Sequence, residues 1–108
     1  MIQVVLLRSA EQDLKELKTY IIKQFGIASW QASYQKIQES VGIIQTFPQS
    51  GKIPEELEKL NRNQYRQVIS GMNRIIYEVR QQTIYIHIIC DTRKDMAALL
   101  TKRLLRSF

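Results

Sequence analysis

The sequence predicts an α+β domain in which two helices pack on one face of an antiparallel sheet and a third helix follows the last strand. Three observations predict this fold class. A β-rich apolar segment opens the chain, two stretches with helical spacing follow it, and three β-rich segments with hairpin-length connectors come next. Helical spacing then returns at the end of the chain. We therefore expect the order β-α-α-β-β-β-α in a single domain, residues 1–108.

The first strand is expected at residues 2–7, because this segment is apolar on both faces. Ser9 and Gln12 have the spacing of a capping box, so a helix should start near Ala10. Gly26 is expected to end this helix, since glycine readily adopts the left-handed backbone that often follows a helix. The apolar stripe of the helix consists of Ala10, Leu14, Leu17, Ile21 and Phe25.

A second helix is expected from about Ser29 to the residue before Pro48, because proline disfavours helical backbone in the residue that precedes it. Only a few residues separate the two helices, so they should form an antiparallel hairpin. Residues 48–63 are expected to form a loop region with one helical turn at 55–60. The apolar stripe of the second helix consists of Trp30, Tyr34, Ile37, Val41 and Ile44.

Three strands are expected at residues 65–70, 74–80 and 83–90, and their short connectors predict an antiparallel meander. The sheet face away from the helical hairpin should be open unless the C-terminal helix or a partner covers it. Strict alternation along the last strand places on one face Ile84, Ile86 and Ile88, and on the other Tyr85, His87 and Ile89.

The composition excludes several classes of protein. With 44% hydrophobic and 24% charged residues, the chain resembles a soluble globular domain and not a disordered segment. One cysteine (Cys90) and one histidine (His87) exclude an internal disulfide, a cysteine-rich zinc site and a multi-histidine metal site. The apolar runs are far shorter than the roughly 20 residues of a membrane span, and the N-terminus does not read as a signal peptide. We therefore expect a cytoplasmic protein without a metal, a cofactor, a membrane partner or a small-molecule substrate.

Positive charge is concentrated in the second half of the chain, and the formal net charge of the whole chain is +6. Residues 1–58 carry six basic and seven acidic side chains, or −1, whereas residues 59–108 carry ten basic and three acidic ones, or +7. Seven of the eight arginines lie in this second half, and arginine binds phosphate and carboxylate through paired hydrogen bonds. The asymmetry indicates either a solvated basic face or an anionic partner, such as nucleic acid or an acidic protein.

Five segments carry a resemblance to a known family. Residues 10–14 (AEQDL) match an A-x-x-D-L helix start, and residues 47–57 (FPQSGKIPEEL) match a P-x-x-G-x-x-x-P-E-L loop with its internal spacing one residue off. Residues 65–66 (YR) and 74–79 (RIIYEV) match Y-R and R-I-I-Y-x-V strands. Residues 88–95 (IICDTRKD) match a strand end with R-x-D, although the residue before the arginine, which is often small in the family, is Thr92 here. In this order, across nearly the whole chain, the segments resemble the RelE/ParE superfamily of toxins from bacterial type II toxin–antitoxin pairs.

The resemblance implies one of two activities, because RelE-like members cut mRNA on the ribosome and ParE-like members poison DNA gyrase without being enzymes. Metal-independent RNA cleavage needs a base, an acid and cations around the phosphate. If the chain is such an RNase, the candidate catalytic residues are Arg66, Arg74 and Arg93, which stand at places similar to those of RelE-like arginines. The alternative for Arg66 and Arg74 is an ion pair with an acidic neighbour such as Glu78, or with the antitoxin.

The proton-transfer partners of an RNase are missing from this pattern. Residues 64–70 contain no lysine, and Leu99 stands where the RelE-like C-terminal tyrosine would fall. His87 lies inside a predicted strand, and arginine is a poor general base because its pKa is too high. The acid–base half of an RNase site is therefore not expected.

The ParE-like branch is favoured by the long helical hairpin, the Pro–Gly loop and the basic, amphipathic end of the chain. The resemblance then implies a toxin that inhibits DNA gyrase and is neutralised by a cognate antitoxin. The alternatives are a RelE-like endonuclease, with the ribosome and mRNA as partners, and an inactive member that binds only its partner. The residues predicted to bind the target or the antitoxin are Arg66, Arg74, Arg93, Lys94, Lys102, Arg103 and Arg106.

Overall fold

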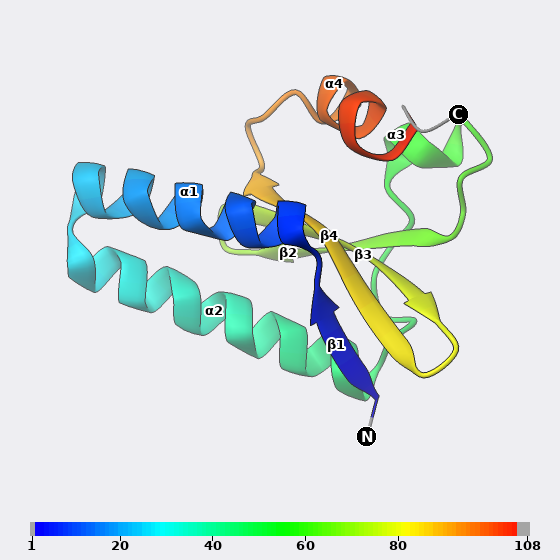
Figure 1. Ribbon diagram of the computed structural model, residues 1–108, viewed down its shortest axis with the longest axis horizontal. Coiled ribbons are helices and arrows are strands. Elements are labelled where there is room, and N and C mark those ends of the chain that lie inside the picture. Colours follow the sequence, from blue (N-terminus) through cyan, green and yellow to red (C-terminus); the bar gives the residue numbers. More distant parts are fainter. Residues whose placement is uncertain (1, 106–108) are drawn as a thin grey trace.

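The computed structural model describes residues 2–105 and confirms the predicted α+β fold class. Two long helices run side by side and lie against a sheet, and a short helix follows the last strand (Figure 1). This last helix continues into a turn of π-helix, η1, and we call the two together the C-terminal helix. The elements are β1 (Gln3–Leu6), α1 (Arg8–Phe25), α2 (Ile27–Thr46), α3 (Glu55–Glu58), β2 (Tyr65–Ser70), β3 (Asn73–Arg80), β4 (Thr83–Asp91), α4 (Met96–Leu100) and η1 (Thr101–Leu105).

The sheet has four strands in the order β1-β4-β3-β2, and it is mixed. Strands β2, β3 and β4 form the predicted antiparallel meander, but β1 pairs with β4 in parallel, so the expectation of an antiparallel sheet holds only for the meander. Tight turns force consecutive strands of the meander to alternate in direction. Two long helices, and not a tight turn, connect β1 to the rest of the sheet, so β1 can run parallel to its neighbour β4.

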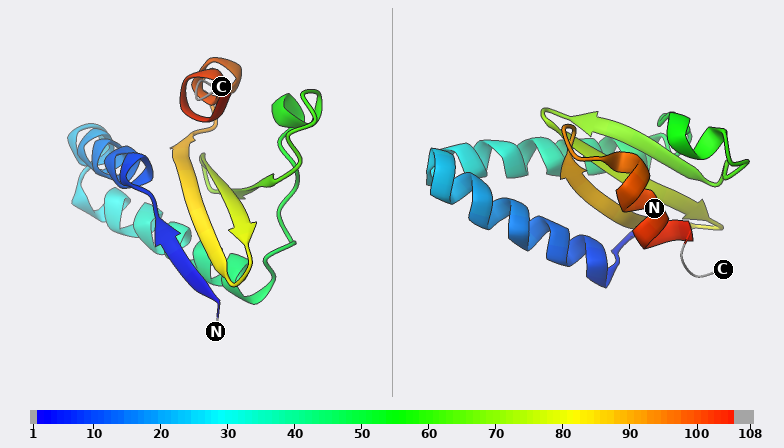
Figure 2. Two further views of the ribbon diagram at one scale, coloured as in Figure 1. Left: turned by 45° about the vertical axis from the view of Figure 1, so that its right-hand side comes forward. Right: turned by 90° about the horizontal axis from the view of Figure 1, so that it is seen from above.

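Each face of the sheet carries its own hydrophobic core. Helices α1 and α2 cover one face, where Ala10, Ile37 and Ile44 pack on residues of β3 and β4. The opposite face is covered by α3 and the C-terminal helix, which lie apart from the hairpin (Figure 2). The C-terminal helix therefore closes the face that the sequence left open, through Met96, Leu100 and Leu104.

A β-bulge at His87 changes the face assignments along β4. Ile76 of β3 pairs with Ile88, but the next residue, Tyr77, pairs with Ile86, so His87 is an extra residue in the ladder. Ile84 and Ile86 belong to the core under the hairpin, whereas Ile88 packs in the core under the C-terminal helix. The prediction that these three isoleucines share a face is wrong for Ile88, because strict alternation does not account for an inserted residue.

Two predictions about the first helix are also wrong. The helix starts at Arg8 after Leu7, and no side chain caps it, so Ser9 is not a capping residue. The strand leads directly into the helix, because Leu7 N–H still donates to Ile86 of β4 while Leu7 C=O accepts from Glu11 N–H at 2.9 Å. At the other end of the helix, Phe25 is 65% exposed, so the buried stripe ends before it.

Candidate functional site

The loop between α2 and α3 is held to the sheet by Tyr77. Its buried hydroxyl donates to Pro48 O at 2.8 Å and accepts from Gly51 N at 3.1 Å. A Cβ at Gly51 would lie 2.5 Å from this hydroxyl and 2.8 Å from Gln67 O, so only glycine fits. Burial raises the pKa of Tyr77, which keeps its hydroxyl protonated. The P-x-x-G and R-I-I-Y segments are thus two sides of one structural contact.

Arg66 belongs to the same contact. Its guanidinium donates to Gly51 O at 2.8 Å and to Gln49 O at 3.3 Å, so it completes the hydrogen bonding of the loop backbone. The Arg66 side chain is half-buried and is bonded to the loop of its own chain, which explains why a Y-R pair accompanies the loop motif.

Arg74 anchors α3 to the sheet on the other side. It forms a two-pronged ion pair with Glu56, with both N–O distances at 3.2 Å, and hydrogen-bonds Gln67 Oε1. The guanidinium holds the pKa of Glu56 below its ordinary value. The sequence had suggested Glu78 as the acidic neighbour, but the partner is Glu56, 18 residues away along the chain.

The three arginines of the RNase hypothesis are not brought together. Arg66 lies opposite Tyr77 in the ladder and Arg74 lies opposite Ile69, so Arg66 and Arg74 project from opposite faces of the sheet. Arg93 lies beyond the end of β4 and is exposed, and it pairs with Asp91 through Nε–Oδ1 (2.9 Å) and Nη2–Oδ2 (2.8 Å). This contact lowers the pKa of Asp91.

The structure does contain a histidine–carboxylate pair that sequence reasoning missed. His87 Nε2 lies 3.0 Å from Glu78 Oε1, and Arg80 holds the other carboxylate oxygen at 3.0 Å. The bulge brings His87 toward Glu78, and no local signal in the sequence marks that bulge. The two side chains are only 15% and 7% exposed, and the Tyr65 ring packs against the imidazole. Burial lowers the pKa of His87 and favours its neutral form.

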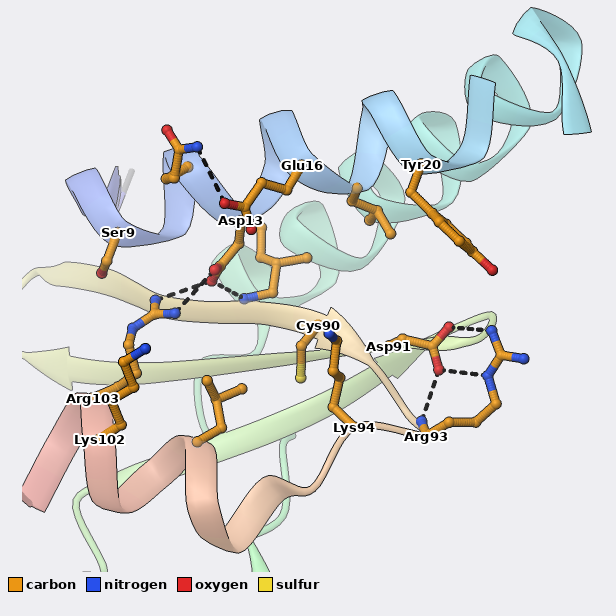
Figure 3. A pocket seen from close by; sticks show the side chains of 14 residues that line it. Ser9, Asp13, Glu16, Tyr20, Cys90, Asp91, Arg93, Lys94, Lys102 and Arg103 are labelled. Carbon is orange, nitrogen blue, oxygen red and sulfur yellow. Dashed lines mark hydrogen bonds and ion pairs between the residues drawn. The ribbon is translucent and has the colours of Figure 1, made fainter. Parts of the chain in front are cut away.

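A cavity lies between α1 and the C-terminal helix, with the end of β4 as its floor (Figure 3). We call it the α1–α4 groove, and its volume is about 780 Å³. It brings together four of the seven predicted binding residues: Arg93, Lys94, Lys102 and Arg103. Arg66 and Arg74 do not line it, and Arg106 lies outside the described residues. Acidic side chains also line it: Asp13, Glu16 and Asp91.

Asp13 and Arg103 close this groove from opposite sides. Strand β1 pairs with β4 only as far as Ile86, so the β4 edge beyond it has no strand neighbour. Asp13 Oδ2 accepts from Ile89 N–H at 3.0 Å on this edge, and both Asp13 oxygens pair with Arg103 at 2.9 and 3.0 Å. Arg103 also donates to His87 O at 2.6 Å. Arg103 is therefore committed to holding the C-terminal helix against α1.

Lys94 and Lys102 differ from Arg103 in exposure and in pairing. Both are exposed, and neither forms an ion pair with a residue that the structure describes. They are the groove cations available to a partner. The thiol of Cys90, also in the groove, is buried, and this burial raises its pKa to about 11, so it is not a nucleophile at neutral pH.

Within residues 2–105, no three histidine, cysteine, aspartate or glutamate side chains gather as a metal site would require. In the same part of the chain, no helix has the length and apolar character needed to cross a membrane.

Fold and groove together define a small α+β domain with a helical hairpin, a second core closed by the C-terminal helix, and a groove between these two parts that is lined by both cations and carboxylates. The chain belongs to the family described as "ParE toxin of type II toxin-antitoxin system, parDE", whose model matches residues 4–96. The resemblance to the RelE/ParE superfamily, and to its ParE branch, is confirmed.

A solved structure supports the same fold. The chain is similar to one described as "Chromosomal ParDE TA system from P. aeruginosa", with a TM-score of 0.69 and 20% identity over 84% of this chain and 96% of that chain. A search of curated proteins found no match. The chain is thus a ParE-like toxin of the type II class, and a cognate antitoxin belongs to such a system.

Proposed function

We propose that this toxin inhibits DNA gyrase by binding it through the lysines of the α1–α4 groove, in the cytoplasm and without cleaving RNA, and that its antitoxin neutralises it by occupying the same groove. The observation that carries this proposal is the state of the cations. The arginines that would have to surround a phosphate are on different faces of the sheet or paired with their own neighbours. Two exposed lysines that form no ion pair with a described residue, Lys94 and Lys102, instead line the α1–α4 groove.

The geometry also disfavours RNA cleavage on chemical grounds. Cleavage needs an exposed acid and base beside the phosphate-binding cations. The only histidine and its carboxylate partner are largely buried, and the bonds to Arg80 and the packing of Tyr65 already satisfy them. Arg66 and Arg74 are engaged elsewhere, and an arginine side chain stays protonated in a protein, so it has no free lone pair with which to abstract a proton.

The α1–α4 groove suits a protein partner of acidic character. Lys94 and Lys102 lie on its C-terminal side, and apolar side chains of Leu17, Ile89 and Leu99 supply a surface that excludes water. Charge complementarity of this kind accelerates association and selects partners, and salt weakens it. A flexible antitoxin segment that folds into the groove would cover both lysines.

The test pairs two measurements on purified toxin and on growing cells. Supercoiling by purified gyrase is measured with the wild type, with Lys94→Glu/Lys102→Glu and with Lys18→Glu, an exposed α1 lysine that lines neither described cavity. We expect inhibition by the wild type and by Lys18→Glu, and loss of inhibition in the double variant. Pulse-labelling after induction should show an early fall in DNA synthesis while protein synthesis continues.

The opposite result would overturn the proposal. An early fall in protein synthesis, with supercoiling untouched, would return the chain to the RelE-like endonucleases. Growth that is unaffected by either route would indicate a member that only binds its antitoxin.

A further inference from the structure

A second, smaller cavity lies under the distal half of the helical hairpin, next to the turn between β2 and β3. Its volume is about 330 Å³. Its floor is a row of three polar residues, because the ladder places Ser70 opposite Asn73 and Asn73 opposite Asp91. The adjacent row, Val68, Ile75 and Ile89, belongs to or packs on the core under the hairpin. The apolar core therefore gives way to a polar row where the cavity begins.

Ser70 is the anomaly of this row. The residue is 4% exposed, and its buried hydroxyl has no hydrogen-bond partner in the part of the chain that the structure describes. A buried hydroxyl without a partner costs free energy, so native proteins nearly always satisfy such groups. Ser70 lines the cavity together with Asn73, which is also buried, and with Ser33 of α2. These residues make this wall of the cavity polar, and the Ser70 hydroxyl, which is buried in the free toxin, is the group among them that lacks a partner.

The electrostatics of the cavity favour an anion. The ionisable groups that face it are Lys36, Asp91, Arg93 and Tyr20. Asp91 and Arg93 neutralise each other at 2.8 Å, which leaves Lys36 as the uncompensated charge. Lys36 bends over the turn, because a Cβ built on Gly71 would lie 3.6 Å from its Cδ and 4.0 Å from its Nζ. Lys36 forms no ion pair with any residue between positions 2 and 105.

The rim of the cavity is apolar and exposed. Tyr20, Phe25 and Met72 line it and are 45%, 65% and 59% exposed. Exposed aromatic and methionine side chains around a small pocket are typical of protein–protein contact surfaces. At this volume, near the lower limit for a ligand pocket, the cavity has room for one anchoring side chain and not for a nucleotide.

We propose that this cavity receives the carboxylate side chain of one acidic residue of the antitoxin, whose neighbouring apolar residues pack on Tyr20, Phe25 and Met72. The carboxylate pairs with the Lys36 ammonium, and it accepts from the Ser70 hydroxyl once that buried hydroxyl rotates about χ1 toward the cavity. The inference rests on the proposed function only in taking the antitoxin as the partner. It assigns a second anchor point, separate from Lys94 and Lys102, and residues shared by the two cavities, Leu17, Tyr20, Asp91 and Arg93, make the surfaces continuous.

The test measures the Kd and dissociation rate of the full-length toxin with the antitoxin that is encoded beside it. The toxin variants are Ser70→Ala, Lys36→Met, Lys36→Arg and, as the matched control, Lys18→Met. We expect Lys36→Met to weaken binding by about tenfold and Ser70→Ala by a few-fold, mostly through faster dissociation, as for loss of a charge-assisted hydrogen bond. Lys36→Arg should keep most of the affinity, and Lys18→Met should bind as the wild type does.

Two further readouts separate binding from a structural role. Ser70→Ala should leave the thermal midpoint of the free toxin unchanged or raise it, because it removes an unsatisfied hydroxyl. Each acidic residue of the antitoxin is then replaced by alanine and combined with Lys36→Met in a double-mutant cycle. We expect one acidic residue whose replacement costs affinity in the wild type and almost none in Lys36→Met.

Three outcomes would overturn the inference. These are wild-type affinity in both Ser70→Ala and Lys36→Met, the absence of any acidic residue coupled to Lys36, and a structure of the complex with only water at Ser70. If Lys94→Glu/Lys102→Glu weakens binding in that case, the proposed function stands without this anchor. If the wild-type toxin binds no antitoxin at all, the proposed function itself fails.

Discussion

Two groups of cations in this toxin have opposite roles. Arg66 and Arg74, which belong to the segments that resemble the family motifs, are bonded to the loop and to α3. Lys94, the unspecified middle residue of the R-x-D segment, and Lys102, which lies in none of the matched segments, are exposed at the α1–α4 groove. The comparison teaches that motif residues which identify the family, such as Arg66 and Arg74, can serve to hold the fold together. The residues available to a partner are instead those that the fold leaves exposed and without an ion pair.

The scaffold side of this comparison predicts its largest effect at Gly51. Gly51→Ala should lower the free energy of unfolding by about 3 kcal/mol, because the added Cβ collides with the Tyr77 hydroxyl and with the backbone carbonyl of Gln67. Denaturant unfolding followed by circular dichroism measures the change. The matched control is Gly42→Ala in α2, where no atom lies within 4 Å, and it should gain about 0.5–1 kcal/mol from helix propensity. Equal effects of the two substitutions would show that the loop contact is not specific.

A second prediction concerns Asp13, which pairs with Arg103 and so holds the C-terminal helix that carries Lys102. Asp13→Ala should cost about 2 kcal/mol, because it leaves Arg103 unpaired and the Ile89 N–H without its acceptor. Glu16→Ala, one turn along the same helix, loses only an exposed contact with Gln12 and should change stability by less than about 0.5 kcal/mol. Urea titration of both variants tests this, and similar losses would mean that the C-terminal helix is not held by the ion pair.

Much of this architecture could be predicted from the sequence, and the exceptions have physical causes. The expected strand at 65–70 matches β2, since turn residues mark its end, where Gly71 adopts a φ of 61°. The parallel pairing of β1 and the bulge at His87 depend on contacts between distant segments, which local patterns do not encode.

The same limit applies to the candidate site. Charge and the family resemblance led to the prediction of Lys94, Lys102 and Arg103 as binding residues, but neither could reveal that Arg103 is paired with Asp13, 90 residues away. The polar row of Ser70, Asn73 and Asp91 is visible only in the register of three strands. The bonds that engage Arg66 and Arg74 could not be predicted either, because they join strands to a loop and a short helix that fold back on them.

A third prediction uses pH to examine the buried pair on the scaffold side. Burial lowers the pKa of His87 in the folded chain below its ordinary value of 6.5. At a pH between this lowered pKa and 6.5, the unfolded chain therefore binds more protons than the folded one. Stability should therefore fall as the pH is lowered through about 6.5. The urea midpoint, measured from pH 7.5 to 5.5, should decrease in the wild type and stay flat in His87→Gln, since this is the only histidine in the sequence. A rise in stability on acidification would mean that Glu78 stabilises a charged imidazole.

The smallest change in stability is expected for substitution of the groove lysines, and it gives the clearest distinction between these lysines and the arginines Arg66 and Arg74. Lys94→Glu/Lys102→Glu should change the free energy of unfolding by less than about 0.5 kcal/mol, because both side chains are exposed and unpaired among the described residues. Arg74→Met should instead lower it by about 2 kcal/mol, because Glu56 and Gln67 lose their partner. Antitoxin affinity should respond in the opposite way, with a large loss and a weaker salt dependence in the lysine variant and little change in the arginine variant. Urea unfolding and titrations at two salt concentrations measure both properties. If the lysine variant unfolds as readily as Arg74→Met, Lys94 and Lys102 are scaffold residues too, and the distinction between the two groups fails.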